Sequence, residues 1–287
     1  MLSQPGAAPS GRQSQSSTTR VVSVRSPIRL RDDQTRRCSA GTCAAGRWAS
    51  AATVWAPLVN WDDVGVNEHL IVRVSAKAVL LDMDGVLVDS TGLVEKHWSQ
   101  WSERRGLDPT TVLRFAHGSP SREVVARFVA AEDVPVEAAW VEGLALDSTT
   151  VEVALPGAHA VLTQRVLPVA VVTSATRAVA RLRLTRAGLP VPAVLVGADD
   201  VARGKPDALP YIRAAQLLNV AASDCVAVED TPAGLASIHA AGAKPLALLT
   251  THRADELSDA LALLADLRTL RVLPGGVGWD SDEAVLR

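Results

Sequence analysis

The 287-residue chain has little of the features that mark several large classes of protein. Its three cysteines, Cys38, Cys43 and Cys225, are too few for a disulfide framework and do not have zinc-ligand spacing. Its longest apolar runs, residues 167–172 and 246–249, are much too short to span a bilayer, and a charged-then-apolar N-terminal signal is missing. The formal net charge is only −2, which gives nucleic acid or a membrane surface no electrostatic attraction. We therefore expect a cytoplasmic protein without nucleic-acid or membrane partners.

The first 75 residues differ in composition from the rest of the chain. They are rich in Ser, Gln, Thr, Arg, Gly and Pro and show no sustained helical or strand period, so we expect a disordered N-terminal extension over residues 1–75. Residues 1–50 hold eight arginines and no lysine, against the two acidic residues Asp32 and Asp33. This composition leaves open a translated stretch upstream of the true start, an organelle transit peptide or a nucleic-acid-binding arm.

From residue 76 onward the pattern becomes regular. Short, continuous apolar runs cover residues 78–81, 169–172, 193–196 and 225–228, as expected for parallel strands that are buried on both faces. Helical patterns cover residues 175–187, 207–219 and 231–241, and a glycine follows the first and the last of them. This alternation predicts an α/β fold whose core is a doubly wound, Rossmann-like parallel sheet.

One interval between the first two predicted strands breaks the alternation. Residues 92–153 carry three helical patterns, the first of which places Leu93, His97 and Trp101 on one face. We therefore predict an all-helical cap domain over residues 92–153. It would be inserted into an α/β core formed by residues 76–91 and 154–272, with a C-terminal tail over residues 273–287.

Two carboxylates, Asp82 and Asp84, follow the first predicted strand directly. In open α/β sheets the active crevice lies at the carboxyl ends of the strands. Carboxylates two positions apart on an extended chain point in different directions, which favours a division of labour. One can attack phosphorus as a nucleophile, while the other exchanges protons with the leaving oxygen and with water. An acidic turn without catalytic function is the alternative reading.

Complementary groups follow the later strands. Thr173 and Ser174 lie at a helix N-terminus, where hydroxyl and N–H groups could cradle a phosphate or simply cap the helix. Lys205, just before a predicted helix, could hold a positive charge against phosphoryl oxygens or lie free on the surface. Glu229 and Asp230 are adjacent carboxylates at a buried strand end, where burying their charges costs free energy unless a positive partner is present. Mg²⁺ is suited to be that partner. Phosphoryl transfer needs this whole combination.

These motifs resemble the haloacid dehalogenase (HAD) superfamily, in the phosphatase branch whose helical, C1-type cap follows the first motif. The resemblance covers about residues 76–270. It is carried within this range by the segments AHGSPSREVV (116–125), VVTSATRAVARLRLTRAGLP (171–190), ARGKPDALPYIRAAQLL (202–218) and VAVEDTPAGLASIHAAGA (226–243). They are most similar to sugar-phosphate, 2-deoxyglucose-6-phosphate and glycerol-phosphate phosphatases.

The resemblance implies a role for each residue of these core motifs. Asp82 would become an aspartyl phosphate, Asp84 would act as general acid and base, and Lys205 would pair with Asp82 and the transferring group. Thr173 and the backbone N–H of Ser174 would bind the phosphoryl oxygens. The implied ligands of the Mg²⁺ cofactor are Asp82, the backbone carbonyl of Asp84, Glu229 and Asp230.

A polar patch in the predicted cap would select the substrate. His117, Gly118, Ser119 and Arg122 lie between two apolar helical faces, where a loop could cover the substrate, although each could instead be solvated or cap a helix. We expect a Mg²⁺-dependent phosphatase that hydrolyses a small phosphate monoester, a sugar phosphate in the first place, and that is a monomer or a weak homo-oligomer.

Three other functions remain open at this point. A β-phosphoglucomutase-like mutase would use the same phosphoaspartate but return the phosphoryl group to another hydroxyl. A glycerol-phosphate phosphatase would differ only in its substrate. A non-catalytic module that keeps the fold is disfavoured, because both aspartates of the first motif, the lysine and the acidic pair are all present.

Overall fold

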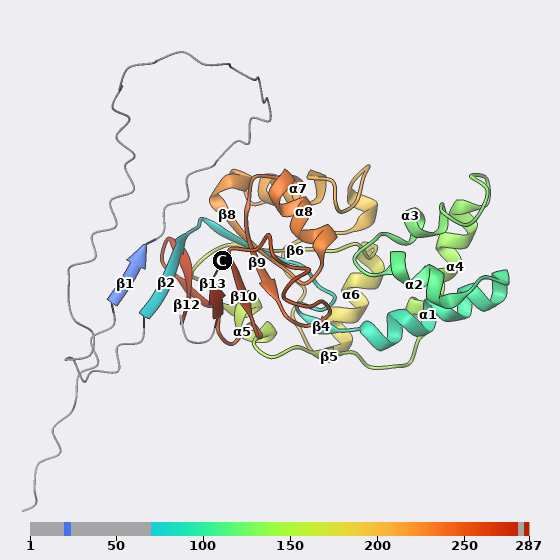
Figure 1. Cartoon of the computed structure of the whole chain (residues 1–287), viewed down its shortest axis with the longest axis horizontal. Helices are drawn as coiled ribbons and strands as arrows, with labels where there is room; N and C mark the ends of the chain where they lie inside the picture. Colours follow the sequence, from blue (N-terminus) through green and yellow to red (C-terminus); the bar gives the residue numbers. More distant parts are fainter. Residues whose placement is uncertain (1–19, 24–69, 281–283, 287) are drawn as a thin grey trace, which may run out of the picture. The chain divides into compact units, whose positions relative to one another are not determined.

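The computed structural model describes residues 20–23, 70–280 and 284–286 of the chain (Figure 1). None of the helices in these ranges combines the length and the apolar character that a membrane span requires.

The core is a seven-stranded sheet with the strand order β13-β10-β9-β8-β3-β6-β7. Its strands are β3 (Ala78–Leu81), β6 (Val169–Val172), β7 (Val194–Val196), β8 (Cys225–Glu229), β9 (Lys244–Leu248), β10 (Ala262–Leu264) and β13 (Ala284–Leu286). All neighbouring strands pair in parallel except β10 and β13. The chain winds outward from β3 through β6 and β7 on one side and places β8 on the other, so β3 lies where the strand order reverses.

Helices bury both faces of this sheet. Along β3, Val79 and Leu81 point into one apolar cluster, and Ala78 and Leu80 point into the other. The first cluster includes residues of α5 (Ala158–Thr163) and α6 (Arg177–Arg186), and the second includes residues of α7 (Leu209–Leu217) and α8 (Pro232–Ala240). Two short 3₁₀ helices, η2 (Ala198–Asp200) and η3 (Ala222–Asp224), complete the connections. The predicted doubly wound α/β fold is therefore confirmed.

Four helices lie in the interval between the first two strands of the core. They are α1 (Thr91–Arg105), α2 (Pro109–Ala116), α3 (Ser121–Val125) and α4 (Val134–Asp147), and they share an apolar cluster of their own (Figure 1). The chain enters and leaves this interval through β4 (Val88–Asp89) and β5 (Val153–Ala154), which pair antiparallel. The interval is the one for which the sequence predicts an all-helical cap, and its status as a separate domain stays a prediction.

The prediction of a disordered extension is wrong in part, and the predicted C-terminal tail contains a strand of the same small sheet. A small sheet, β1-β2-β12-β11, contains β1 (Arg20–Ser23) and β2 (Leu70–Ser75) from the predicted extension and β12 (Gly276–Asp280) from the predicted tail, next to β11 (Arg271–Leu273). β2 has the two-residue period of a half-buried strand, because Val72 and Val74 are buried and Ser75 is exposed. Its partner β12 lies about 200 positions further along the chain, so no local pattern reveals the pairing. The remainder of residues 1–75 lies outside the described residues.

Candidate active site

The carboxyl ends of three adjacent strands bring the predicted site residues together. Asp82 follows β3, Thr173 follows β6, and Glu229 is the last residue of β8 with Asp230 directly after it. Because β6 and β8 flank β3 and all three run parallel, these side chains meet at one edge of the sheet. Lys205 reaches the same place from the loop between η2 and α7, so residues 123 positions apart come into contact.

A buried lysine joins two of the carboxylates. Lys205 is 2% exposed, and its Nζ donates to Oδ1 of Asp82 at 2.6 Å and to the backbone carbonyl of Val172 at 3.1 Å. The same Nζ lies 2.5 Å from Oε1 of Glu229. A buried ion pair is tolerated only with such complete pairing, so Lys205 and Asp82 fix each other's position.

Glu229 is fully buried, and hydrogen bonds hold both of its oxygens. Oε1 accepts from the hydroxyl of Tyr211 at 2.8 Å, in addition to its contact with Lys205. Oε2 accepts from the backbone N–H of Asp230 at 3.1 Å and from the hydroxyl of Thr231 at 3.1 Å. Glu229 therefore anchors Lys205 and the turn after β8 more than it faces the cavity.

Asp230 is the carboxylate with a free oxygen. It is 1% exposed, its Oδ2 accepts from the hydroxyl of Thr251, and its Oδ1 is buried without a hydrogen-bond partner. Oxygens of Asp82, Glu229 and Asp230 all lie within 4.8 Å of one another. An unpartnered buried carboxylate oxygen beside further hard oxygen donors fits a divalent cation, so this group of residues could hold a metal ion.

The charges of this cluster do not balance. Burial, and then the carboxylate of Glu229, raise the pKa of Asp82 from 3.8 to about 8, because the Lys205 ammonium offsets them only in part. Burial and the neighbouring carboxylates of Glu229 and Asp82 raise the pKa of Asp230 well above its usual range. Burial lowers the pKa of Lys205, but the same two partners outweigh it and raise the pKa, which keeps the ammonium charged. An ionised Asp82 therefore needs a further positive charge beside it.

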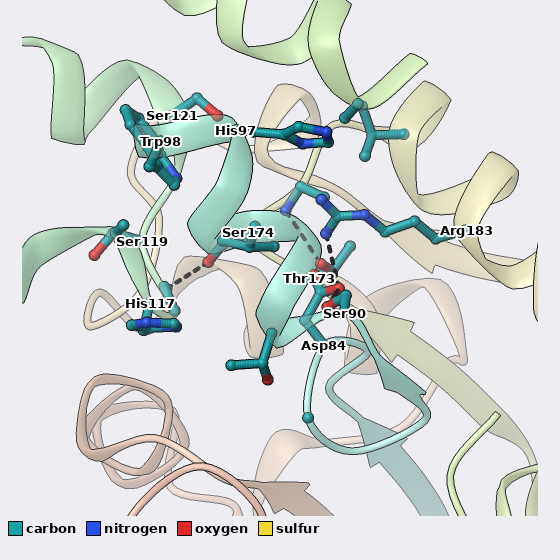
Figure 2. A pocket seen from close by; sticks show the side chains of 18 of the residues that line it. Asp84, Ser90, His97, Trp98, His117, Ser119, Ser121, Thr173, Ser174 and Arg183 are labelled. Carbon is teal, nitrogen blue, oxygen red and sulfur yellow. Dashed lines mark hydrogen bonds and ion pairs between the residues drawn. The ribbon is translucent and has the colours of Figure 1, made fainter. Parts of the chain in front are cut away.

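Asp84 belongs to a second group of polar side chains, with Ser90 and Arg183. Its Oδ1 accepts from the hydroxyl of Ser90 and, at 2.7 Å, from Nη1 of Arg183 (Figure 2). Its side chain is 30% exposed and lines the cavity. The two aspartates of the first motif thus point into different surroundings, as the sequence predicts for residues that divide the work.

Thr173 and Ser174 stand at the start of the segment that leads into α6. Thr173 is buried, and its Oγ1 accepts from the backbone N–H of Ala175 at 3.1 Å, which leaves the hydroxyl proton free to donate. The hydroxyl of Ser174 donates to the backbone carbonyl of Gly118 at 2.7 Å (Figure 2). This bond links the core to the loop between α2 and α3.

The cavity lies between the strand ends and the helices of the insertion. Besides the core residues, its lining includes His97, Trp98, His117, Gly118, Ser119, Val141, Glu142 and Thr176. Nε2 of His117 lies 3.6 Å from Oε1 of Glu95. Arg122 is exposed and does not line the cavity, so the structure brings together the other predicted residues of the cap loop but not this one.

Several residues at the site have no counterpart in the sequence prediction. Arg183, Tyr211 and Thr251 contact Asp84, Glu229 and Asp230 respectively. Each lies inside a helix or in a loop far along the chain, where a lone polar residue carries no signal. Only the position of Tyr211, four residues after the start of the helix predicted over residues 207–219, could have drawn notice.

Comparisons with known proteins agree with this geometry. A model of the haloacid dehalogenase-like hydrolases matches residues 76–242. The chain is 40% identical over 202 residues to "Hexitol phosphatase A" of Escherichia coli (strain K12), and the matched region covers 68% of this chain and 94% of that protein. It is 37% identical over 205 residues to "Validoxylamine A 7'-phosphate phosphatase" of Streptomyces hygroscopicus subsp. limoneus, with 68% and 96% covered. The crystal structure of a hydrolase from Pseudomonas syringae shares the fold, with a TM-score of 0.61 at 20% identity over 67% of this chain and 94% of that one.

Proposed function

Because the chain belongs to the haloacid dehalogenase-like hydrolase family, we propose that it is a Mg²⁺-dependent phosphatase that hydrolyses a small phosphate monoester through a phosphorylated Asp82. The observation that supports this most strongly is the contact between Asp82 and the buried Lys205, next to the unpartnered oxygen of Asp230. It combines a nucleophile, a fixed positive charge and room for a cation at one point, as phosphoryl transfer requires.

The side chains of the site divide the reaction between them. A carboxylate oxygen of Asp82 attacks phosphorus, and the bond from phosphorus to the ester oxygen breaks. Asp84 gives a proton to that leaving oxygen and then takes one from the water that hydrolyses the aspartyl phosphate. The free hydroxyl proton of Thr173, the backbone N–H of Ser174 and the ammonium of Lys205 hold the phosphoryl oxygens.

The acidic cluster supports Mg²⁺ as the cofactor. Asp82 and Asp230 would hold it with the backbone carbonyl of Asp84, and Glu229 would act from behind them through Lys205 and the turn after β8. When bound, the ion supplies the positive charge that keeps Asp82 ionised and that neutralises the phosphate. The oxygen donors of Asp82, Asp84 and Asp230 suit Mg²⁺ better than a metal that prefers nitrogen or sulfur.

The substrate class that we propose is a sugar phosphate or polyol phosphate. The two relatives named above support this, since one is named a hexitol phosphatase and the other a validoxylamine A 7'-phosphate phosphatase. The cavity supports it too, because His97, Ser119 and Thr176 can exchange hydrogen bonds with hydroxyl groups. That the protein is cytoplasmic, a monomer or weak homo-oligomer, and free of nucleic-acid or membrane partners stays a prediction from the sequence.

Phosphate release from a panel of sugar, deoxy-sugar and polyol monophosphates, with and without Mg²⁺, tests the proposal. We expect release that depends on the metal and that vanishes in the Asp82→Asn variant. Conversion of a hexose 1-phosphate into its 6-phosphate isomer without release of inorganic phosphate would instead identify a mutase. Absence of both reactions would refute an enzymatic role of this site.

A further inference from the structure

The guanidinium of Arg183 lies between the predicted general acid and the segment through which the chain leaves the helical insertion. Arg183 is 7% exposed and extends from α6 toward Asp84, to which its Nη1 donates at 2.7 Å (Figure 2). Arg183 is not among the residues to which the family resemblance gives a role. A buried arginine is retained only where its charge is paired, so the partners of both Nη1 and Nε need an explanation.

At one end, Arg183 determines how the carboxylate of Asp84 is oriented. Oδ1 of Asp84 accepts from both Arg183 and Ser90, whereas no hydrogen bond engages Oδ2 within the described residues. The oxygen left for an exchange with substrate is therefore Oδ2. Because a planar guanidinium and a hydroxyl bind the same oxygen, the carboxylate cannot rotate freely about its last bond.

At the other end, Arg183 faces Glu152, next to β5. The side chain of Glu152 is 1% exposed and its two oxygens have no hydrogen-bond partner. Its nearest cations are Nε of Arg183 and Nη1 of Arg186, each at 4.0 Å. Nε of Arg183 is also buried without a partner. These groups attract each other across the gap but stop about 1 Å short of a hydrogen bond.

A second arginine fastens the same helix to the insertion. Arg186, three positions after Arg183 and on the same side of α6, donates to the backbone carbonyls of Ala145 and Leu146 at 3.2 and 3.3 Å and to that of Ser148. These carbonyls end α4 and would otherwise lack partners. These hydrogen bonds attach α6 to the C-terminal end of α4. The segment that contains Glu152 runs from there back to the core.

We propose that Arg183 is a positioning residue that orients Asp84 for proton transfer and that Glu152 holds Arg183 in place, so that the general acid is coupled to the return segment of the helical insertion. This inference rests on the proposed function. It adds a residue pair, Arg183 and Glu152, that acts on the leaving group through Asp84 without touching the phosphoryl group.

The test uses the dependence of the rate on the leaving group. Full-length Arg183→Met, Arg183→Lys and Glu152→Gln variants are compared with Arg181→Met, a matched control because Arg181 is exposed on the same helix. Each is assayed with the best sugar phosphate of the panel and with p-nitrophenyl phosphate. The sugar alkoxide needs a proton to depart, whereas p-nitrophenolate departs without one, so only the first reaction depends on an oriented acid.

Release of the leaving group is measured in a single turnover with excess enzyme, because it precedes the hydrolysis of the aspartyl phosphate, in which Asp84 acts on both substrates alike. We expect Arg183→Met to lower this rate for the sugar phosphate by about 10²-fold and to leave it within about threefold for p-nitrophenyl phosphate. Arg183→Lys keeps the charge but not the forked geometry, so its loss on the sugar phosphate is about tenfold. Glu152→Gln shifts the ratio of the two rates in the same direction, and Arg181→Met leaves both rates unchanged. Should Arg183→Met fail to fold, the lysine variant decides by the same ratio.

Equal losses of the single-turnover rate on both substrates, weaker binding of the sugar phosphate with the maximal single-turnover rate unchanged, or no loss at all would overturn the role of Arg183. Those outcomes differ from a failure of the proposed function. In that case the unmodified protein would release phosphate from neither substrate.

Discussion

Gly234, in the first turn of α8, lies against the carboxylate that anchors the site. A Cβ atom at this position would lie 1.9 Å from Cδ of Glu229 and 2.0 and 2.1 Å from its two oxygens, where ordinary contacts begin at 3.4 Å. Both residues are buried, so the clash of a Gly234→Ala variant is relieved only if Glu229 moves. The movement required is about 1.5 Å, which is more than a hydrogen bond tolerates.

The magnitude follows from the bonds that this movement breaks. Glu229 accepts from Tyr211 and Thr231 and pairs with Lys205, and hydrogen bonds to a charged group contribute about 1.5–3 kcal/mol each. The loss of two of these three interactions costs about 3–6 kcal/mol, and alanine gains about 1 kcal/mol over glycine in a helix, which leaves a net loss of about 2–5 kcal/mol in the free energy of unfolding. For a chain of this size the Tm should fall by about 5–20 °C. Displacement of Lys205 should lower kcat by about 10²-fold or more.

The assay pairs thermal unfolding with phosphate release, and Gly143→Ala is its matched control. Gly143 lies within α4, and a Cβ there would meet nothing within 4 Å. The same substitution should therefore raise stability by about 0.5–1 kcal/mol at this position and leave kcat unchanged. A Gly234→Ala variant with the Tm and kcat of the unmodified protein would refute the packing argument for Glu229.

Three further predictions concern the metal, the buried tyrosine and a histidine. Adding Mg²⁺ should raise the Tm of the unmodified protein but not that of Asp230→Asn. At a Mg²⁺ concentration a hundredfold above Kd the rise corresponds to about 2.7 kcal/mol of added stability. An equal rise in both proteins would show that Asp230 does not bind the metal. Tyr211→Phe removes a donor to the buried Glu229, so urea unfolding should show a loss of about 1–3 kcal/mol, and an unchanged midpoint would contradict the bond. Burial, and then Arg183 and Lys96, lower the pKa of His97 from 6.5 to about 4. As the pH falls below 6.5, His97 therefore takes up a proton in the unfolded chain but stays neutral in the folded one. Stability should therefore fall by about 1–2 kcal/mol between pH 7 and pH 5 relative to His97→Gln, and parallel pH profiles of the two proteins would contradict a neutral His97.

The sequence predicts those parts of the fold that depend on short-range pattern. The run at residues 78–81 is β3 and the run at 169–172 is β6, because strands buried on both faces are apolar at every position. Helix ends differ by two residues or fewer, since α7 begins at Leu209 where the pattern starts at residue 207. The small sheet was missed because β2 and β12 are distant in sequence and each is short.

The same distinction holds for the site. Asp82 and Thr173, which directly follow strands, and Lys205, which precedes a helix, are predicted as site residues because chemistry and position agree. Arg183 and Glu152 were not, because their importance depends on which helix packs beside which segment. Arg122 is the opposite case, since it is a polar residue near the predicted cap loop that lies outside the cavity lining. Its role in substrate binding has no support from its position.

The central claim is that Asp82 takes up the phosphoryl group. It is tested most directly by quenching the protein during turnover of its best sugar phosphate with Mg²⁺ and reducing it with borohydride. The modified residue is then identified by mass spectrometry. Phosphate release by Asp82→Asn is measured alongside. An aspartyl phosphate is reduced to homoserine, so we predict homoserine at position 82 and a fall in phosphate release of at least about 10⁴-fold in the variant. Homoserine at another aspartate, or release by Asp82→Asn at a rate close to that of the unmodified protein, would contradict the account.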